Sequence, residues 1–415
     1  MEKKKLMNRS YVVVGAVLIQ LALGAIYAWS VFTPSLVADG WSKQDTQWIF
    51  AVGLASFAII MVYGGKRMGT WGPQRLSLIG GIILGLGYIL AGLFGGTNFW
   101  SLLIFIGLIG GAGIGFAYVV PIAVGMRWFP DKKGMITGLA VAGFGFGAML
   151  WVKLAGEWGN LIASFGLSNT FTIYGIAFAL MVIIGALWMK MPPADYEPAG
   201  HEVKKAAAAK IVTTKDFTSG EMLGKIQFYL IFLTFVFSAG AGLMSIGLMK
   251  LYPMEALQNA GLTAMQASAV AGTAMAVFFS LANGLGRIIW GLISDKLGRK
   301  NSILIMTATQ GIIVILFTYM AGSEVLLYLG ATLIGFNFGG NFALFPTITA
   351  DTFGAKNVGQ NYPFVFLAYG VGGILGPILG GKMGDLGNFP LAFTISGVAV
   401  LIGTLLILIV RPATK

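Results

Sequence analysis

One arginine stands inside an apolar segment that is long enough to cross a bilayer. The segment runs from Ala267 to Ser294, and Arg287 lies seven residues before its end, roughly 10 Å of helix rise. A guanidinium keeps its proton, and inserting one at that depth costs at least about 2.5–3.5 kcal/mol. We therefore expect Arg287 to face a water-filled cavity or an anion, as a planar fork that hydrogen-bonds a carboxylate. The alternative is a structural arginine that extends to the interface or bonds backbone carbonyl groups.

Asn283 precedes Arg287 by four residues, so the two side chains share one face of a helix. An amide does not titrate, but it can hydrogen-bond a hydroxyl group or a carboxylate. A polar contact between helices is the alternative role of Asn283. All fifteen acidic residues fall in loops or at the ends of apolar segments, which indicates no buried carboxylate relay. Anion exchange and proton symport therefore both remain open as coupling mechanisms.

The composition excludes a soluble protein. The chain has 415 residues, of which 57% are hydrophobic and only 10% charged, against about 25% charged residues in soluble domains. It has no cysteine and one histidine, His201, so we expect no disulfide, no metal site and no cofactor. The first apolar run follows Met-Glu-Lys-Lys-Lys, has span length and lacks a small-residue cleavage site, which predicts a transmembrane helix rather than a signal peptide.

Twelve apolar segments predict an all-α polytopic membrane protein with twelve transmembrane helices. A long polar stretch, 190–224, follows the sixth segment and is typical of a linker. We expect a six-helix bundle on each side of it, over 1–189 and 225–415. The segments are 11–37, 47–64, 76–96, 100–124, 134–156, 169–189, 225–249, 265–293, 301–321, 325–347, 362–381 and 389–410.

The basic residues predict the orientation. If the N-terminus is inside, 22 of the 27 Lys and Arg residues are cytoplasmic, four are outside, and the last is Arg287. This asymmetry predicts cytoplasmic N- and C-termini in the cell membrane. The net charge of +12 then reflects topology, so no nucleic-acid partner is expected, while contact with anionic membrane lipids is.

Two short basic turns suggest an internal repeat. Residues Gly291–Lys300 read GLISDKLGRK between the eighth and ninth segments, and Gly64–Arg75 read GGKRMGTWGPQR at the equivalent place in the first half. A chain of six plus six helices with this repeated loop resembles the major facilitator superfamily. The resemblance implies alternating access, a monomer, and a gating role for the loop residues Gly291, Asp295 and Arg299. The first-half copy departs from the family, because Gly69 stands where the family has an aspartate that helps to hold the outward-open state.

Three further stretches narrow the resemblance. They are Arg127-Trp-Phe-Pro-Asp-Lys-Lys-Gly134, Lys215-Asp-Phe-Thr-Ser-Gly-Glu-Met-Leu223, and the region from Leu344-Phe-Pro to Asn361-Tyr362. Together they are similar to the oxalate/formate antiporter family, near the monocarboxylate (lactate) transporters. The resemblance implies a secondary active transporter of small carboxylate anions, not an enzyme, with its substrate arginine at the position of Arg287.

The most informative departure from that family is Tyr369. Oxalate carriers of the family have a lysine there, as a second cation that faces the arginine. A dicarboxylate buried against one cation would keep an uncompensated charge, at a cost of several kcal/mol. We therefore expect a monocarboxylate such as lactate, pyruvate, acetate or formate, with proton symport favoured and the Tyr369 hydroxyl as a neutral donor. Oxalate:formate exchange is the alternative function, and ordinary packing is the alternative role of Tyr369.

Five more aromatic residues are candidates for the substrate cavity. Tyr27 and Tyr118 match tyrosines of the family, whereas Phe338, Phe342 and Phe366 stand where the oxalate carriers have Trp or Tyr. Phenyl groups lack hydrogen-bond donors and suit a substrate with an apolar end. Each of these rings could equally serve in helix packing or at the membrane interface.

Overall fold

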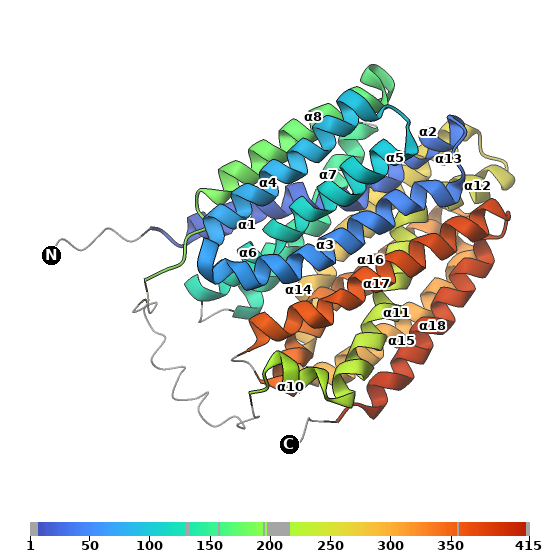
Figure 1. Ribbon diagram of the computed structural model, residues 1–415. Helices are drawn as coiled ribbons and strands as arrows, with labels where there is room; N and C mark the ends of the chain where they lie inside the picture. Colours follow the sequence, from blue (N-terminus) through green and yellow to red (C-terminus); the bar gives the residue numbers. More distant parts are fainter. Residues whose placement is uncertain are drawn as a thin grey trace.

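The computed structural model describes residues 7–129, 133–156, 158–193, 196, 216–354 and 357–411, and over these residues the protein is helical (Figure 1). Twelve of the described helices are long and apolar enough to cross a membrane, with 18 to 34 residues each. They coincide with the twelve apolar segments, so the predicted polytopic all-α fold is confirmed.

The N-terminal bundle contains the first six spans. Span one consists of three consecutive helical pieces, and spans three and four each include a π-helical segment. The elements are α1 (Ser10–Leu23), the 3-10 helix η1 (Gly24–Val31), α2 (Thr33–Ala38), α3 (Lys43–Trp71), α4 (Pro73–Leu90), η2 (Ala91–Gly95), α5 (Phe99–Leu102), η3 (Leu103–Gly110), α6 (Gly111–Trp128), α7 (Lys133–Ala155) and α8 (Leu161–Ala186).

The C-terminal bundle contains the other six spans, preceded by one short helix. Its eighth span again includes a π-helical segment, immediately before the helix that carries Arg287. The elements are α10 (Ser219–Leu223), α11 (Ile226–Leu248), α12 (Leu251–Asn259), α13 (Ala264–Thr273), η4 (Ala274–Phe279), α14 (Ser280–Leu297), α15 (Arg299–Met320), α16 (Glu324–Phe353), α17 (Val358–Asp385) and α18 (Phe389–Ile409).

Backbone chemistry explains this architecture. Hydrocarbon offers no hydrogen bonds, so each span pairs its own peptide groups in a helix. At the starts of two helices, side chains accept hydrogen bonds from the unpaired backbone N–H groups. The Ser42 hydroxyl accepts from the Asp45 N–H, and Thr263 and Gln266 form a capping box. The two repeated turns have the same backbone, with Gly72 at φ 78°, ψ 153° and Gly298 at φ 81°, ψ 153°. Both turns need glycine because φ is positive, which supports the internal repeat.

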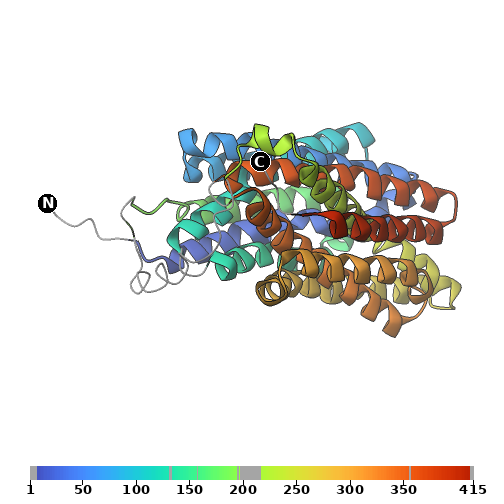
Figure 2. The same ribbon diagram turned by 90° about the horizontal axis from the view of Figure 1, so that it is seen from below.

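The spans lie side by side along a common axis, as Figures 1 and 2 show from two directions. Helix α1 begins and α18 ends at the same end of the molecule, here called the terminal end. The opposite end, here called the far end, carries α2, α12 and α13. Helix α3 packs against α17 and α7 against α14, and these two contacts join the bundles. Which end faces the cytoplasm stays a prediction from the basic residues.

The structure describes mainly the two ends of the predicted linker. Residues 194–195 and 197–215, with His201, lie outside the described residues, as do residues 130–132 of the loop after span four. Residues 216–224 are ordered against the C-terminal bundle. The Phe217 N–H donates to the Phe353 carbonyl (2.8 Å), and the Asn361 amide donates to the Phe217 carbonyl (3.0 Å). The Asp-Phe-Thr-Ser-Gly stretch thus docks where α16 ends and α17 begins, while the linker boundary itself stays a prediction.

Candidate functional site

Arg287 lies in the middle of the molecule on α14, and only 1% of it is exposed. Its Nε donates to the Asn283 Oδ1 one turn earlier, at 2.9 Å. The predicted pairing of these two side chains on one helix face is therefore present. The amide oxygen of Asn283 is directed at the arginine, so it orients the guanidinium.

The remaining donors of this pair have no acceptor in hydrogen-bonding geometry, although the Tyr27 and Tyr118 hydroxyls lie near the guanidinium. Within the described part of the chain, Nη1 and Nη2 of Arg287 and Nδ2 of Asn283 are buried without a hydrogen-bond partner. A buried unsatisfied donor costs about 1–3 kcal/mol, and more when it is charged. These three donor atoms, two on Arg287 and one on Asn283, would be stabilised by a bound molecule that offers hydrogen-bond acceptors.

Aromatic rings cover the guanidinium. The Cζ atom of Arg287 lies 4.0 Å from the ring centroid of Phe342 on α16 and 5.5 Å from that of Phe144 on α7. Such contacts stabilise a desolvated cation by about 2 kcal/mol or more. They explain how the charge is accommodated in this conformation, in which side chains close the centre of the molecule.

Two tyrosines meet beside the arginine and link the bundles. The hydroxyl of Tyr27 on η1 and that of Tyr369 on α17 are 3.0 Å apart and form a hydrogen bond. Tyr27 is 1% exposed and Tyr369 is fully buried. Either hydroxyl can be the donor of this bond, so the other keeps its own proton free to donate to a further acceptor.

The other predicted aromatic residues complete the same cluster. Phe338 lies 5.7 Å from Tyr27 and 5.3 Å from Phe342, measured between ring centroids. Phe366 stacks on Tyr369 at 4.8 Å and lies 5.8 Å from Tyr118 on α6. The structure therefore brings together all eight residues that are predicted from the sequence to contact the substrate. They are Tyr27, Tyr118, Asn283, Arg287, Phe338, Phe342, Phe366 and Tyr369.

Sequence reasoning missed three members of the cluster. Phe57 on α3 lies 4.9 Å from Tyr118 and 5.5 Å from Phe366, and Phe144 contacts the arginine itself. The phenol of Tyr362 is also within electrostatic range of Arg287. Only for Phe144 did the sequence give an indication. It lies between Gly143 and Gly145, and small neighbours let a helix approach another closely.

No carboxylate balances Arg287 among the described residues. The ion pairs between described residues lie at the two ends: Lys43 with Glu255, and Arg299 with Asp295 and Asp351. Lys153 and Arg287 are the only charged side chains that are buried in the described part of the chain. Lys153 lies in the last turn of α7, away from the aromatic cluster, and its ammonium donates to the Thr273 hydroxyl at 3.4 Å. Arg287 is thus the buried positive charge that the cluster presents to a bound molecule.

The loop signature assembles at the terminal end. The Arg299 guanidinium pairs with the Asp295 carboxylate (2.6 Å) and the Asp351 carboxylate (3.5 Å), and it also donates to the Ser294 hydroxyl. These bonds tie α14, α15 and α16 together. A Cβ on Gly291 would meet only the Ala343 methyl group, at 3.8 Å, so packing does not require glycine there.

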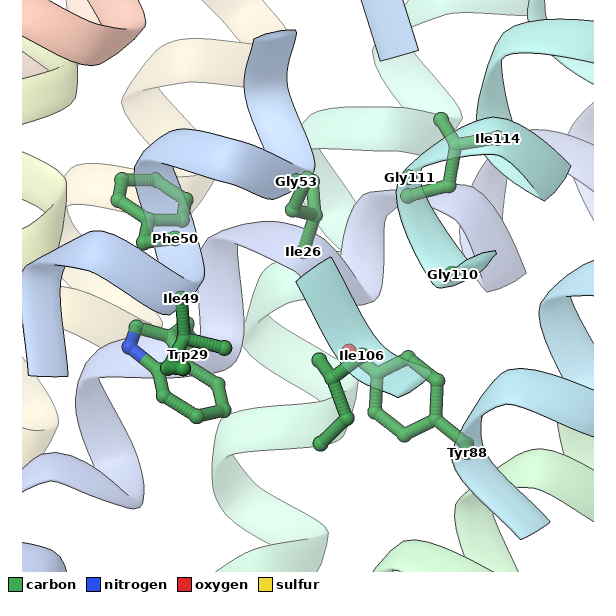
Figure 3. Close-up of a pocket in the computed structure, with 10 residues that line it drawn as sticks. All are labelled: Ile26, Trp29, Ile49, Phe50, Gly53, Tyr88, Ile106, Gly110, Gly111 and Ile114. Atoms are coloured by element: carbon green, nitrogen blue, oxygen red, sulfur yellow. The ribbon is translucent and has the colours of Figure 1, made fainter. Parts of the chain in front are cut away.

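A pocket in the N-terminal bundle lies apart from this cluster. Figure 3 shows its wall, which includes Ile26, Trp29, Ile49 and Ile106 and has the Tyr88 phenol on one side. None of the eight predicted residues lines it, and its lining has no charged group. A pocket of this kind does not attract an anion, so the cluster around Arg287 remains the candidate site.

Comparison with known proteins decides the family. A model of the Major Facilitator Superfamily matches residues 13–278 and 251–415, which together cover nearly the whole chain. The chain belongs to the Major Facilitator Superfamily. It is accordingly a multi-pass transporter of the cell membrane, and the predicted family is confirmed.

Its similarity to individual superfamily members extends over most of the sequence. An uncharacterized MFS-type transporter of Escherichia coli (strain K12), YhjX, is 30% identical, over 88% of this chain and 86% of its own length. The oxalate:formate antiporter of Oxalobacter formigenes is 26% identical, over 97% and 91%. Apicoplast pyruvate carrier 1 of Toxoplasma gondii is 26% identical, over 80% and 68%. Carriers of small carboxylates are thus among the relatives of this superfamily member.

Proposed function

We propose that the protein is a secondary active carrier of a short monocarboxylate, such as lactate, pyruvate, acetate or formate, that it works by alternating access and that it is coupled to protons. Arg287 binds the carboxylate through Nη1 and Nη2, and Asn283 donates a further hydrogen bond. The hydroxyls of Tyr27, Tyr118 and Tyr369 are neutral donors around the same group.

The observation that carries this proposal is the set of unpaired donors beside a single cation. Three buried donors without an acceptor call for a ligand with several acceptor oxygens, which a carboxylate supplies. One guanidinium balances one carboxylate. The rings of Phe338, Phe342 and Phe366 suit the apolar end of a monocarboxylate, and they offer no donor to a second carboxylate.

We include proton coupling in the proposal because the site has one cation for one carboxylate and lacks a second cation. In the described part of the chain no Asp or Glu is buried, so the protein offers no fixed proton carrier at the centre. A proton can then travel on the carboxyl group of the substrate, whose neutral form no longer pairs with Arg287, or through an acidic residue at the end of a span. Uptake into proteoliposomes with an imposed pH gradient measures this coupling, and strong counterflow with no response to the gradient would contradict it.

Oxalate:formate exchange is the second candidate, favoured by the 26% identity to the antiporter over 97% of the chain. Ligand-induced thermal stabilisation of the purified protein separates the two functions. We expect L-lactate or formate to raise the melting temperature and oxalate to leave it unchanged. Stabilisation by oxalate and not by the monocarboxylates would refute the preferred substrate class.

Arg287→Ala tests the site itself. Removing one partner of a buried charge pair costs about 2–5 kcal/mol, so we expect affinity to fall by at least about 30-fold and uptake to be lost. Membrane insertion and elution as a single species should be retained, because truncation also removes a costly buried charge. Near-normal uptake by this variant would show that Arg287 does not bind the substrate.

A further inference from the structure

Phe144 and Arg287 form a contact between the two bundles at the centre of the site. Phe144 belongs to α7 of the N-terminal bundle, and its ring centroid is 5.5 Å from the guanidinium carbon on α14. Phe342, from the same bundle as Arg287, lies at 4.0 Å. The guanidinium therefore has two aromatic neighbours, and the negative face of such a ring attracts a cation.

The N-terminal bundle sets the position of the Phe144 ring. Its centroid lies 4.9 Å from that of Tyr27 and 5.4 Å from that of Tyr118, both edge to face, and the residue is 1% exposed. A Cβ on Gly24 would overlap the Phe144 carbonyl, so glycine lets α7 pack directly on η1. If the two bundles move apart as rigid bodies in alternating access, this ring leaves Arg287 when the bundles open.

The bond between Tyr27 and Tyr369 is a second contact between the two bundles at the site. Tyr27 and Tyr369 come from opposite bundles, and one hydrogen bond of 3.0 Å joins their hydroxyls. Closing the bundles thus places rings from both bundles against the guanidinium and joins the two hydroxyl groups, while Nη1 and Nη2 of Arg287 stay without a hydrogen-bond acceptor. Neither contact needs a bound anion.

These contacts bear on whether the carrier can perform net transport or only exchange. Net transport requires the carrier to reorient once loaded and once unloaded, whereas exchange requires only the loaded step. A buried cation without a partner would block the unloaded step, because its desolvation is not compensated. Resting on the function proposed above, we propose that Phe144 and Phe342 act as partners of Arg287 when no anion is bound. The unloaded carrier can then close and reorient, and the protein performs net transport as well as exchange.

The test compares two fluxes through the purified full-length protein in proteoliposomes. The vesicles are loaded with labelled L-lactate or, in parallel, labelled formate, and K⁺ with valinomycin and nigericin clamps voltage and pH. Efflux is measured into buffer without substrate, as net flux, and into buffer with the same unlabelled substrate, as exchange. We expect the wild-type protein to show both fluxes at similar rates.

Phe144→Leu removes the ring face and keeps an apolar side chain. We expect it to lower the ratio of net flux to exchange by about 30-fold, the effect of losing one desolvated cation–π contact. Phe144→Tyr keeps the ring face and should restore the ratio. Phe178→Leu is the matched control, since Phe178 is an equally buried phenylalanine of the same bundle that packs on Tyr88 and Trp151. It should keep the wild-type ratio.

The outcomes separate the two proposals. Wild-type protein that exchanges L-lactate or formate but shows no net flux would overturn the inference and the proposed proton coupling, and it would leave the proposed monocarboxylate carrier standing as an exchanger. This comparison needs no variant to fold. An unchanged ratio in Phe144→Leu, or an equal loss in Phe178→Leu, would overturn the role of Phe144. Absence of both fluxes with both probes would reject the proposed function itself.

Discussion

At the scale of residues, one buried positive charge and the groups around it decide what the carrier can bind. Arg287 has an oriented amide neighbour, two ring faces and no carboxylate partner among the described residues. Tyr369 lies in the same cluster and contributes a neutral hydroxyl. The selectivity between one and two carboxylates therefore depends on a single position.

Tyr369→Lys should shift the substrate preference towards dicarboxylates. The ammonium would provide a second cation for a second carboxylate, and close buried charge pairs contribute about 1.5–7 kcal/mol, so we expect oxalate affinity to rise at least about tenfold. A buried lysine also sheds its proton readily, so the gain should fade as pH rises. Isothermal titration with oxalate and L-lactate measures both effects.

Tyr369→Phe is the control for this change. It removes the bond to Tyr27 and adds no charge, so it should not improve oxalate binding. If Tyr369→Phe and Tyr369→Lys bind oxalate equally well, charge at this position does not select the substrate.

At the scale of elements, glycines let α14 lie directly against its neighbours and so place the arginine. A Cβ on Gly286 would overlap the Phe336 carbonyl of α16, and one on Gly145 would approach the Gly284 backbone nitrogen to 2.8 Å. The π-helical segment η4 comes directly before α14 and changes the rotation of the helix that follows it. The direction of Arg287 thus depends on close backbone contacts on two sides.

Gly286→Ala should destabilise the protein and weaken ligand binding together. The added methyl group must push α14 away from α16, an overpacking that typically costs about 1–3 kcal/mol. Gly291→Ala on the same helix is the stability control, since its nearest neighbour would be a methyl group at 3.8 Å. Thermal melting of the two variants checks this, and equal melting temperatures would show that the α14–α16 contact is not restrictive.

At the scale of the whole molecule, the polar contacts between the bundles are unevenly distributed. At the far end, the Asp385 carboxylate of α17 accepts from the backbone N–H groups of Lys43 (2.7 Å) and Gln44 (3.0 Å), which begin α3. Lys43 also pairs with Glu255 at 2.8 Å. Between described residues, the hydrogen bonds and ion pairs that join the bundles lie at this end or at the centre, whereas the terminal end shows Lys66 over the Phe364 ring. This conformation is therefore locked at the far end.

Asp385→Asn should open the far end. The carboxylate caps the first turn of α3 from the opposite bundle, and losing such a cap costs about 1 kcal/mol, or about a fivefold change in the ratio of closed to open molecules. Because the chain has no cysteine, spin labels at Ala38→Cys and Asn259→Cys report the distance across this end without background.

We expect a longer-distance population to appear in Asp385→Asn. Asp45→Asn changes a carboxylate in the same first turn of α3 that makes no described bond to the other bundle, so its distances should match those of the parent protein. A lengthening in Asp45→Asn as large as that in Asp385→Asn would attribute the effect to α3 alone.

The sequence predicted much of this molecule. The twelve spans and the buried arginine follow from hydropathy over a span length and from the cost of a charge in hydrocarbon, and both are local properties of the chain. The pairing of Asn283 with Arg287 follows from helical spacing alone. The aromatic candidates came from family resemblance, and their convergence on Arg287 agrees with it.

Only the tertiary structure decided which groups meet across the bundles. Tyr27 and Tyr369 are 342 positions apart, and nothing local brings their hydroxyls together. The ring of Phe144 over Arg287 and the cap of Asp385 on α3 also join residues that are far apart in the sequence. Such contacts depend on how each helix is rotated and how closely glycines let neighbours approach, and hydropathy carries no information on either.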